Sequence, residues 1–531
     1  MAQTVLQQNK NSSSGKFSPE SFSELALKLA DSFLAQNNLA HNASISGEDE
    51  LSANNRLDKK TLFKVSDLSM FFPVKGHKNM FVRANDGISV NIYEGETLGL
   101  VGESGCGKST FGRTLLQLYT QTGGNILFYG RPLDTVAPRY LYNVIKNLPG
   151  EIDRLLKLYG KDRKAAEDLF YLLVRIFGGV LLCESGDEVI RIYMEHYNAA
   201  VARNKILDEI SKTELALKEA SVTEKSDNSA KTEAFTKTLK ELKISLAEAE
   251  DELKKKFSGI EALRQANSGI EGFEKLEQLR DDGIDLARLS YNEMRRLRRD
   301  MQIIFQDPYS SLNPRMTVGQ IIGEGPLAHN FFSGTGEALQ EHVMTAMENC
   351  GLAPYMIHRY PHQFSGGQRQ RIGIARSLAV SPKFVVCDEA VSALDVSIQS
   401  QILNLLSDLK EKENLTYLFI SHNLSVIKYI SDRIGVMYLG NIVELAKSAD
   451  IFEKPRHPYT EALLTAIPTT RSVRSEDAII LEGDIPSPIN PPKGCKFHTR
   501  CRYVTDVCRE EIPAFRETDP GHFVACHHYL Q

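Results

Sequence analysis

The stretch from Gly102 to Thr110 carries glycines, one lysine and hydroxyl side chains at a spacing suited to phosphate chemistry. Glycines let successive backbone N–H groups turn toward phosphate oxygens, and the start of a following helix adds further unpaired N–H groups. Lys108 is predicted to reach the β and γ phosphates of a nucleotide, and Ser109 to ligate Mg²⁺. The candidate phosphate-binding residues are Gly102, Ser104, Gly105, Gly107, Lys108, Ser109 and Thr110.

Further polar side chains follow apolar runs that are typical of buried strands. The run that begins at Phe384 ends in Asp388 and Glu389. Asp388 suits Mg²⁺ held through water, and Glu389 suits alignment and activation of an attacking water. Gln306 follows the apolar run 301–305, and His422 ends the run that begins at residue 417. A buried structural histidine is the ordinary explanation at such a position, but parallel sheets bind ligands where their strands end.

A second glycine-rich segment opens another predicted helix. A serine and two glycines at a helix start form an anion-binding N-terminus. The residues concerned are Ser365, Gly366, Gly367 and Gln368. Asp395 lies about one turn beyond the strand that ends at Glu389. The chain therefore carries two phosphate-binding devices, which need not act on the same nucleotide.

The elements that position these residues begin with the apolar strand Thr97–Val101 and the helix predicted after it. Residues 62–90 alternate apolar and polar side chains around turn residues, which indicates short strands. Within them Phe72 lies about 36 residues before Lys108. An aromatic ring there could stack on a nucleotide base or pack in the core, and both readings stay open. The pattern as a whole predicts an α/β fold.

Residues 134–284 have a different character and predict a helical insertion. Apolar side chains recur at spacings of four and three, which is typical of a coiled-coil seam. The clear seam comprises Phe235, Leu239, Leu242, Leu246, Ala249 and Leu253. A weaker run contains Ile206, Ile210, Thr213, Leu217 and Ala220. We predict two antiparallel helices joined by a turn, either as a docking arm or as a solvated elaboration.

Composition limits the other possibilities for this 531-residue chain. A formal net charge of −5 gives no general reason to expect a nucleic-acid partner. The N-terminus lacks the apolar core of a secretory signal, and no apolar run is long enough to span a membrane. The nearest candidate, Leu169–Cys183, is predicted to be a buried helix followed by a short strand. Residues 1–60 are expected to be a mobile tail around one short helix, 22–34.

The C-terminal residues 456–531 hold four of the eight cysteines. Without a secretory signal, metal binding or burial is a better explanation than disulfides. The four are Cys495, Cys501, Cys508 and Cys526. Their spacing matches neither a double CxxC zinc pattern nor a bacterial ferredoxin run. One metal centre with four thiolates and a set of unliganded thiols both remain open.

Taken together, these motifs resemble an ABC-type ATPase. The resemblance covers about 61–133 and 285–455 and implies a RecA-like sheet with antiparallel β and helical subdomains. It identifies Gly102–Thr110 as Walker A, Gln306 as the Q-loop and Ser365–Gln368 as the signature. Asp388 and Glu389 then end Walker B, Asp395 marks the D-loop, His422 is the switch histidine, and Phe72 matches the adenine-stacking aromatic. The implied Mg²⁺ ligands are Ser109, Gln306 and Asp388, and the implied catalytic residues are Glu389, His422 and Gln306.

Longer segments narrow the resemblance to oligopeptide/dipeptide importers, and to their F-type more than their D-type subunit. The segments are Ile304–Pro314, Tyr360–Ser365 and His457–Thr460. The cysteine-containing tail resembles the C-terminal extension of these ATPases, which in some members is associated with a [4Fe-4S] cluster; that centre is favoured over Zn²⁺. Two features depart from the family pattern. Ala390 stands where proline is usual, and the insertion 134–284 is foreign to it.

The resemblance implies an ATPase that energises peptide uptake from the cytoplasmic side of a bacterial inner membrane. ATP would lie between the Walker A of one subunit and the signature of another. The implied partners are a second, D-type ATPase subunit, two transmembrane permeases and an extracytoplasmic peptide-binding protein reached through them. Two alternatives are motivated by the insertion. One is a non-transport ABC ATPase of DNA maintenance, and the other is a regulatory protein in which the ATPase acts only as a switch.

Overall fold

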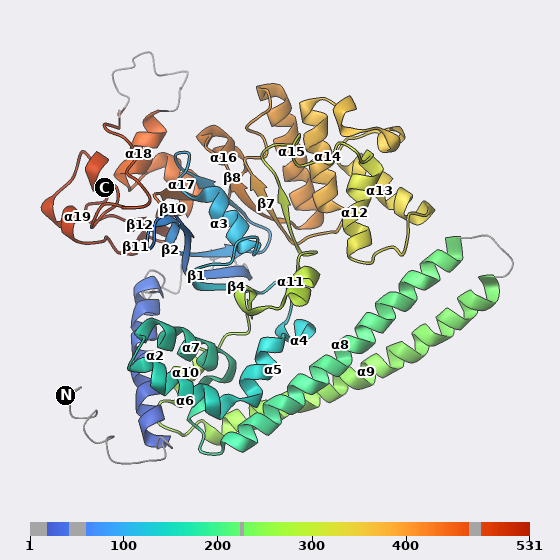
Figure 1. Cartoon of the computed structure of the whole chain (residues 1–531), viewed down its shortest axis with the longest axis horizontal. Coiled ribbons are helices and arrows are strands. Elements are labelled where there is room, and N and C mark those ends of the chain that lie inside the picture. The colour runs from blue at the N-terminus through green and yellow to red at the C-terminus, as the bar shows by residue number, and fades with distance from the viewer. Residues whose placement is uncertain (1–18, 42–59, 223–227, 467–478, 480, 531) are drawn as a thin grey trace. The chain divides into compact units, whose positions relative to one another are not determined.

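The computed structural model describes residues 19–41, 60–222, 228–466, 479 and 481–530 (Figure 1). They divide into two compact units. The helical unit draws on residues 1–38, 137–205 and 245–282, and the sheet unit on residues 39–136, 206–244 and 283–531. Within the described ranges, no helix is both long and apolar enough to cross a membrane.

The sheet unit is built on an eight-stranded sheet of order β11-β12-β10-β9-β3-β8-β7-β6. Its five central neighbours, from β9 to β6, run parallel. The strands are β3 (Thr97–Val101), β6 (Met301–Ile304), β7 (Phe384–Asp388), β8 (Thr416–Ile420), β9 (Arg433–Tyr438), β10 (Asn441–Lys447), β11 (Phe515–Asp519) and β12 (His522–Ala525). Because β3, β7 and β8 are buried along their whole length, they read as continuous apolar runs in the sequence.

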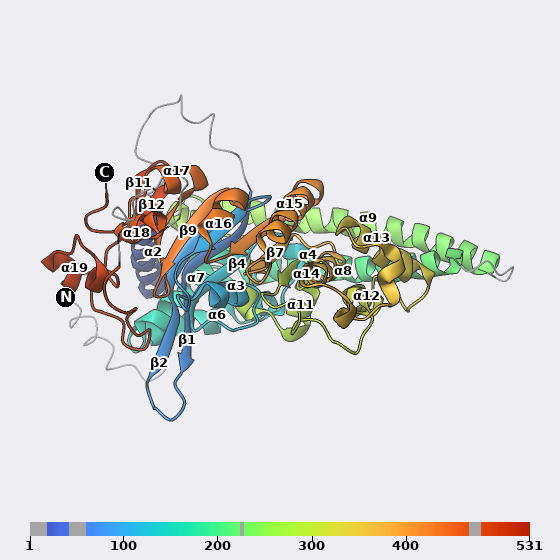
Figure 2. The same cartoon turned by 90° about the horizontal axis from the view of Figure 1, so that it is seen from above.

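A second, antiparallel sheet has the order β2-β1-β4-β5. Its strands are β1 (Thr61–Pro73), β2 (Phe81–Tyr93), β4 (Gly123–Phe128) and β5 (Ile284–Asp285). β1 and β2 form one long hairpin where the sequence predicted short strands (Figure 2). The register shifts within this pair interrupt the alternation of polar and apolar residues, which is why the sequence read as shorter pieces.

The helix α3 (Lys108–Leu115) contacts strands of both sheets. Its Phe111 is fully buried in one apolar cluster with Phe63 of β1 and Val386 of β7. The start of α3 is therefore fixed between the two sheets.

The remaining elements of the sheet unit are mostly helices. They are α4 (Leu133–Val136), η3 (Leu286–Arg288), α11 (Tyr291–Leu297), α12 (Val318–Ala328), α13 (Glu337–Asn349), η4 (Pro354–His358), η5 (Pro361–Gln363), α14 (Gly366–Leu378), α15 (Val396–Glu413), α16 (Leu424–Ile430), α17 (Ser448–Glu453), α18 (Pro458–Thr465), η7 (His498–Arg500) and α19 (Asp506–Glu510). A second apolar cluster joins α12, α13, α14 and α15 to the sheet.

The helical unit contains only helices among its described residues. They are α2 (Pro19–His41), α5 (Arg139–Lys146), α6 (Leu148–Tyr159), α7 (Arg163–Phe177), η2 (Gly178–Leu182) and α10 (Phe273–Glu277), with parts of α8 (Gly186–Val222) and α9 (Asn228–Asn267). The predicted helix 22–34 lies within α2. The rest of the expected N-terminal tail falls mainly on residues 1–18 and 42–59, outside the described residues.

α2 is a built-in part of the helical unit. Phe33 stacks on Tyr171 of α7 with ring centroids 5.6 Å apart, and Asp31 pairs with Lys275 of α10 at 2.7 Å. Ala26 and Leu29 are buried. A segment from the start of the chain therefore completes the core formed by residues more than a hundred positions later.

One predicted element is wrong. The short strand expected at the end of Leu169–Cys183 is the 3₁₀ helix η2, which is buried throughout. Gly178 ends α7 at φ 57°, and Gly179 lies so close to the ring of Phe273 that an added Cβ would come within 2.5 Å of it. The segment packs against helices, and no strand is described in this unit for it to pair with.

The predicted antiparallel helices are α8 and α9 (Figure 1). Ion pairs link Glu195 to Lys256 at 3.1 Å and Glu214 to Lys243 at 3.9 Å, so the order of contacts reverses along the two helices. All six residues of the clear seam are at least partly buried, and Leu253 is the most buried of them at 9% exposure. The two antiparallel helices are confirmed, whereas the predicted turn falls on residues 223–227, outside the described residues, and coiled-coil packing stays a prediction.

Candidate functional site

The phosphate-binding loop follows β3 and leads directly into α3, as the sequence predicted. Gly107 adopts φ 103°, and a Cβ there would lie 2.1 Å from the carbonyl oxygen of Ala84. Asn85 is buried and donates its side-chain amide to the Gly107 carbonyl at 3.1 Å. Strand β2 therefore presses on the loop from outside, and only glycine fits at position 107.

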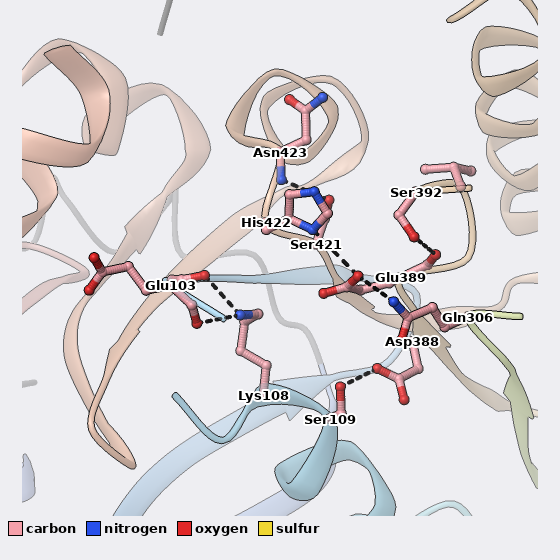
Figure 3. A network of polar contacts seen from close by, with 12 residues as sticks. Glu103, Lys108, Ser109, Gln306, Asp388, Glu389, Ser392, Ser421, His422 and Asn423 are labelled. Atoms are coloured by element: carbon pink, nitrogen blue, oxygen red, sulfur yellow. Dashed lines mark hydrogen bonds and ion pairs between the residues drawn. The ribbon is translucent and has the colours of Figure 1, made fainter. Parts of the chain in front are cut away.

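Lys108 is buried within the loop, at 4% exposure. Its ammonium donates to the carbonyl of Gly102 at 2.8 Å and to that of Glu103 at 3.0 Å (Figure 3). The neighbouring Cys106 has its pKa raised by burial, so its thiol stays protonated. The third donor of the Lys108 ammonium meets Cys106 Sγ at 3.7 Å, so contact with a nucleotide phosphate exchanges at least one of these three bonds.

Asp388 at the end of β7 lies beside the start of α3. The Ser109 hydroxyl donates to Asp388 Oδ1 at 2.5 Å, and Arg113 Nη2 donates to Oδ2 at 3.1 Å. Asp388 is buried. A hydroxyl and a carboxylate oxygen are hard ligands of the kind Mg²⁺ prefers, so this pair fits the predicted ion. Arg113 was not singled out in the sequence, because nothing local marks its partner.

Glu389 gathers the other predicted catalytic residues. Gln306 Nε2 donates to Glu389 Oε2 at 2.9 Å, and His422 Nδ1 lies 3.4 Å from the same oxygen (Figure 3). The three come from the ends of the neighbouring strands β6, β7 and β8. Glu389 itself has φ 49°, a backbone conformation that non-glycine residues rarely adopt. The arrangement can hold a carboxylate ready to accept a proton from water.

The second glycine-rich segment forms the start of α14. Ser365 caps the helix and exchanges hydrogen bonds with Gln368, in a capping box. Gly367 faces Ile398 of α15, and Asp395 caps α15 by accepting from the Ile398 N–H at 3.0 Å. In both views α14 lies among the helices α12, α13 and α15, away from α3 (Figures 1 and 2). These residues are therefore not brought to the phosphate loop of their own chain.

Phe72 lies in β1 and is half-buried. Its ring meets Tyr119 edge to face, with centroids 5.3 Å apart. The stacking of Phe72 on a base stays a prediction.

Gly102, Lys108 and Ser109 make the loop contacts above, whereas Ser104 and Gly105 are exposed within the same loop.

The four C-terminal cysteines line one pocket together with His498, His527 and His528. Burial raises the pKa of Cys495 and of Cys526 to about 11, so both thiols are protonated near neutral pH. Yet within the described part of the chain no three cysteine, histidine or acidic side chains are arranged to hold a metal ion. The fold gathers the predicted ligands without forming a finished metal site.

Two protein families match parts of this chain. Residues 85–259 and 270–392, more than half of the chain, match the ABC transporter family. Residues 443–508 match the C-terminal region of oligopeptide/dipeptide transporters, and three of the four C-terminal cysteines fall within them.

Individual relatives agree with the family matches. The oligopeptide transport ATP-binding protein AppF of Bacillus subtilis is 35% identical over 480 residues, covering 89% of this chain and 98% of that protein. A Brucella ovis protein named as a peptide import ATP-binding protein is 55% identical over 249 residues, 47% of this chain and 78% of its own length. A solved ATP-binding cassette, dimeric with ADP and phosphate, shows 16% identity and a TM-score of 0.41 over 73% of this chain and 99% of that one.

Proposed function

The chain belongs to the ATP-binding subunits of ABC transporters, in their oligopeptide/dipeptide group, and on that premise we propose that it hydrolyses ATP to energise peptide uptake. The observation that carries this proposal is the meeting of Gln306, Glu389 and His422 at three strand ends, beside a phosphate loop. The match at 443–508 supports peptides as the cargo.

The chain's own residues divide the chemistry between them. The loop N–H groups and Lys108 bind the phosphates, and Ser109 with Asp388 would hold Mg²⁺, which neutralises developing charge on the phosphate oxygens. Glu389 orients and deprotonates the attacking water. Gln306 and His422 fix the Glu389 carboxylate at its Oε2. Catalysis of this kind rests on positioning and electrostatics rather than on a covalent intermediate.

The signature residues suggest how the subunit works in an assembly. Ser365 and Gln368 lie at the start of α14, away from the phosphate loop of the same chain. We propose that they complete the nucleotide site of a second ABC ATPase subunit, of the D-type. Two permeases and an extracytoplasmic peptide-binding protein complete the proposed importer. The chain would lie peripherally on the cytoplasmic face of the inner membrane.

We also propose a metal centre in the C-terminal extension, with a [4Fe-4S] cluster favoured over Zn²⁺. Its support is the shared pocket of Cys495, Cys501, Cys508 and Cys526. Binding would require the thiols to lose their protons and to close around the centre. Iron, sulfide and zinc analysis of anaerobically purified protein, with its visible absorption spectrum, tests the proposal. Metal-free protein purified without oxygen would contradict it.

The non-transport alternative is not favoured. It was motivated by the α8–α9 hairpin alone, whereas the oligopeptide/dipeptide C-terminal region is a feature of transporters. Whether the hairpin is a docking arm or a solvated elaboration is a question that deleting the insertion would answer.

The test is affinity purification of the tagged chain from native membranes in mild detergent, followed by reconstitution in vesicles. We expect two multi-span permeases and a second ATPase to co-purify, and peptide to stimulate ATP hydrolysis. Recovery from the soluble fraction with DNA or ribosomes, and without a permease, would overturn the proposal. An insertion-deleted chain serves as comparison, because a mere elaboration leaves the peptide-stimulated rate unchanged.

A further inference from the structure

The phosphate loop is held from outside by a residue of the C-terminal extension. Arg500, the last residue of η7, reaches Glu103 with both terminal nitrogens: Nη1 lies 2.8 Å from Oε2 and Nη2 lies 3.1 Å from Oε1. The Arg500 side chain is only 6% exposed, and that of Glu103 is 25% exposed. A bidentate pair with one buried partner fixes orientation as well as position.

Glu103 is also fixed through its backbone. Its N–H donates to the hydroxyl of Tyr459 at 3.0 Å, and its carbonyl accepts from Lys108 at 3.0 Å. One loop residue therefore connects the extension, the helix α18 and the phosphate-binding lysine. Moving Glu103 would move the carbonyl from which Lys108 must turn to meet a nucleotide.

The segment that carries Arg500 is itself anchored. Phe497 packs against Tyr438 and Tyr459 with ring centroids 5.2 and 5.4 Å apart, and all three rings are buried. Lys496 pairs with Asp86 of β2 at 2.8 Å. These contacts join the extension to β2, β9 and α18, so Arg500 is presented on a fixed support and not on a free tail.

We propose that Arg500 and Tyr459 are positioning residues of the nucleotide site, and that the C-terminal extension thereby sets the affinity for ATP. Arg500 neutralises a carboxylate that otherwise stands in the phosphate loop and repels the polyphosphate. Tyr459 holds the same residue by its backbone. The inference rests on ATP binding at this loop and is independent of the transported solute.

The test compares charge variants of the assembled transporter, by titration with a fluorescent ATP analogue and by steady-state hydrolysis. Arg500→Gln leaves the Glu103 charge uncompensated, so we expect Kd and KM for ATP to rise about tenfold, with kcat within about twofold. Glu103→Gln removes the partner of Arg500 and leaves its positive charge unpaired beside the phosphate loop, so we expect Kd to fall about threefold at low salt. The double variant should return to within about threefold of the parent chain.

Arg502→Gln is the control for the loss of an arginine–glutamate pair, because Arg502 pairs with Glu461 of α18 at 2.9 Å, with 48% of its side chain exposed, and not with Glu103. Its nucleotide affinity should equal that of the parent chain. A purely structural role predicts instead that Glu103→Gln and Arg500→Gln weaken binding alike and that the double variant is no better. That result, or equal effects of the two arginine variants, would overturn the proposal.

If Arg500→Gln does not fold, two further variants test the proposal in its place. Arg500→Lys keeps the charge and should lose only part of the affinity. Tyr459→Phe keeps the ring but removes the acceptor for the Glu103 N–H, and Kd should rise about threefold. Unchanged affinity in both of these variants would equally count against the inference.

Discussion

The two halves of the nucleotide site are built differently. In the phosphate-binding half, Lys108 and Asp388 are buried, and Glu103 is held by contacts from two other elements. In the hydrolytic half, the side chain of His422 is 57% exposed, and it meets Glu389 at the longer distance of 3.4 Å. The binding half is fixed by the fold, whereas the hydrolytic half is held by few contacts and open to a partner.

Because of this difference, substitutions in the two halves should affect different measured properties. A change in the phosphate-binding half breaks buried interactions, so it should affect stability or nucleotide affinity. A change in the hydrolytic half removes a group that the fold hardly needs, so it should affect turnover alone. Three substitutions test this division, and a fourth tests a buried histidine that belongs to neither half.

Glu389→Gln should give the largest effect. The amide keeps the size of the side chain but cannot accept the proton of water, so kcat should fall about 10² to 10⁴-fold. Nucleotide affinity and melting temperature should stay within error, as measured by titration and calorimetry. The exposed Glu411→Gln is the control. Near-normal turnover in Glu389→Gln would remove Glu389 from the role of base.

His422→Ala should come next. His422 Nδ1 lies 3.4 Å from Glu389 Oε2, and losing a polar contact to a charged group should cost about 1.5 to 3 kcal/mol, or a ten- to hundredfold fall in kcat. Because His422 is mostly exposed, the melting temperature should not change. If His422→Ala lowered the melting temperature as much as Arg113→Met does, the two halves would not differ in how firmly the fold holds them.

Arg113→Met removes the cation beside the buried Asp388. The Arg113 side chain is 36% exposed, so water partly replaces it, and we expect a loss of about 2 kcal/mol in stability. Calorimetry should show a melting temperature lower by a few degrees, and Arg113→Lys should recover part of it. An unchanged melting temperature would mean that this half is less fixed than its burial indicates.

His457 gives the smallest expected effect and a pH signature. It caps α18 through Nδ1, and burial lowers the pKa of its imidazole to about 4. The unfolded chain, with a pKa near 6.5, binds the proton more readily, so stability is complete above about pH 6.5 and falls as pH drops toward 4. Between pH 7 and pH 5.5 this amounts to about 1 kcal/mol.

The check is the difference in pH dependence between the parent chain and His457→Asn, which keeps a capping side chain without a titratable ring. Unfolding at several pH values should show a flatter profile for the variant. The exposed His362→Asn should leave the profile as it was. If the stability of His457→Asn changed with pH as steeply as that of the parent chain, other groups would be responsible for the pH dependence.

The sequence predicted which residues of the candidate site lie at the ends of neighbouring strands, because a local pattern marks each of them. Asp388, Glu389 and His422 lie at or just after the ends of buried strands, Lys108 follows the loop after another, and parallel strands bring their ends to one edge. The helical hairpin was predicted for a similar reason, because a seam repeats along each helix.

What it could not predict were pairings across long stretches of chain. Arg113 and Asp388 are 275 positions apart, and Arg500 and Glu103 are 397 apart. No spacing rule connects such partners, since only the folded topology brings them together. The prediction of a strand near Val180 was wrong because contacts with distant parts of the chain decide the conformation of this segment. A short apolar run is compatible with a strand or a buried turn, and its neighbours decide between them.

The place of α2 in the helical unit also has a consequence for biosynthesis. At about 5 to 20 residues per second, the ribosome completes α7 and α10 roughly 10 to 50 s after α2 has been made. Until α7 has been made, Phe33 lacks its partner Tyr171, and until α10 has been made, Asp31 lacks its partner Lys275. A nascent chain that exposes an apolar face for this long presents a surface of the kind that a chaperone at the ribosomal exit binds.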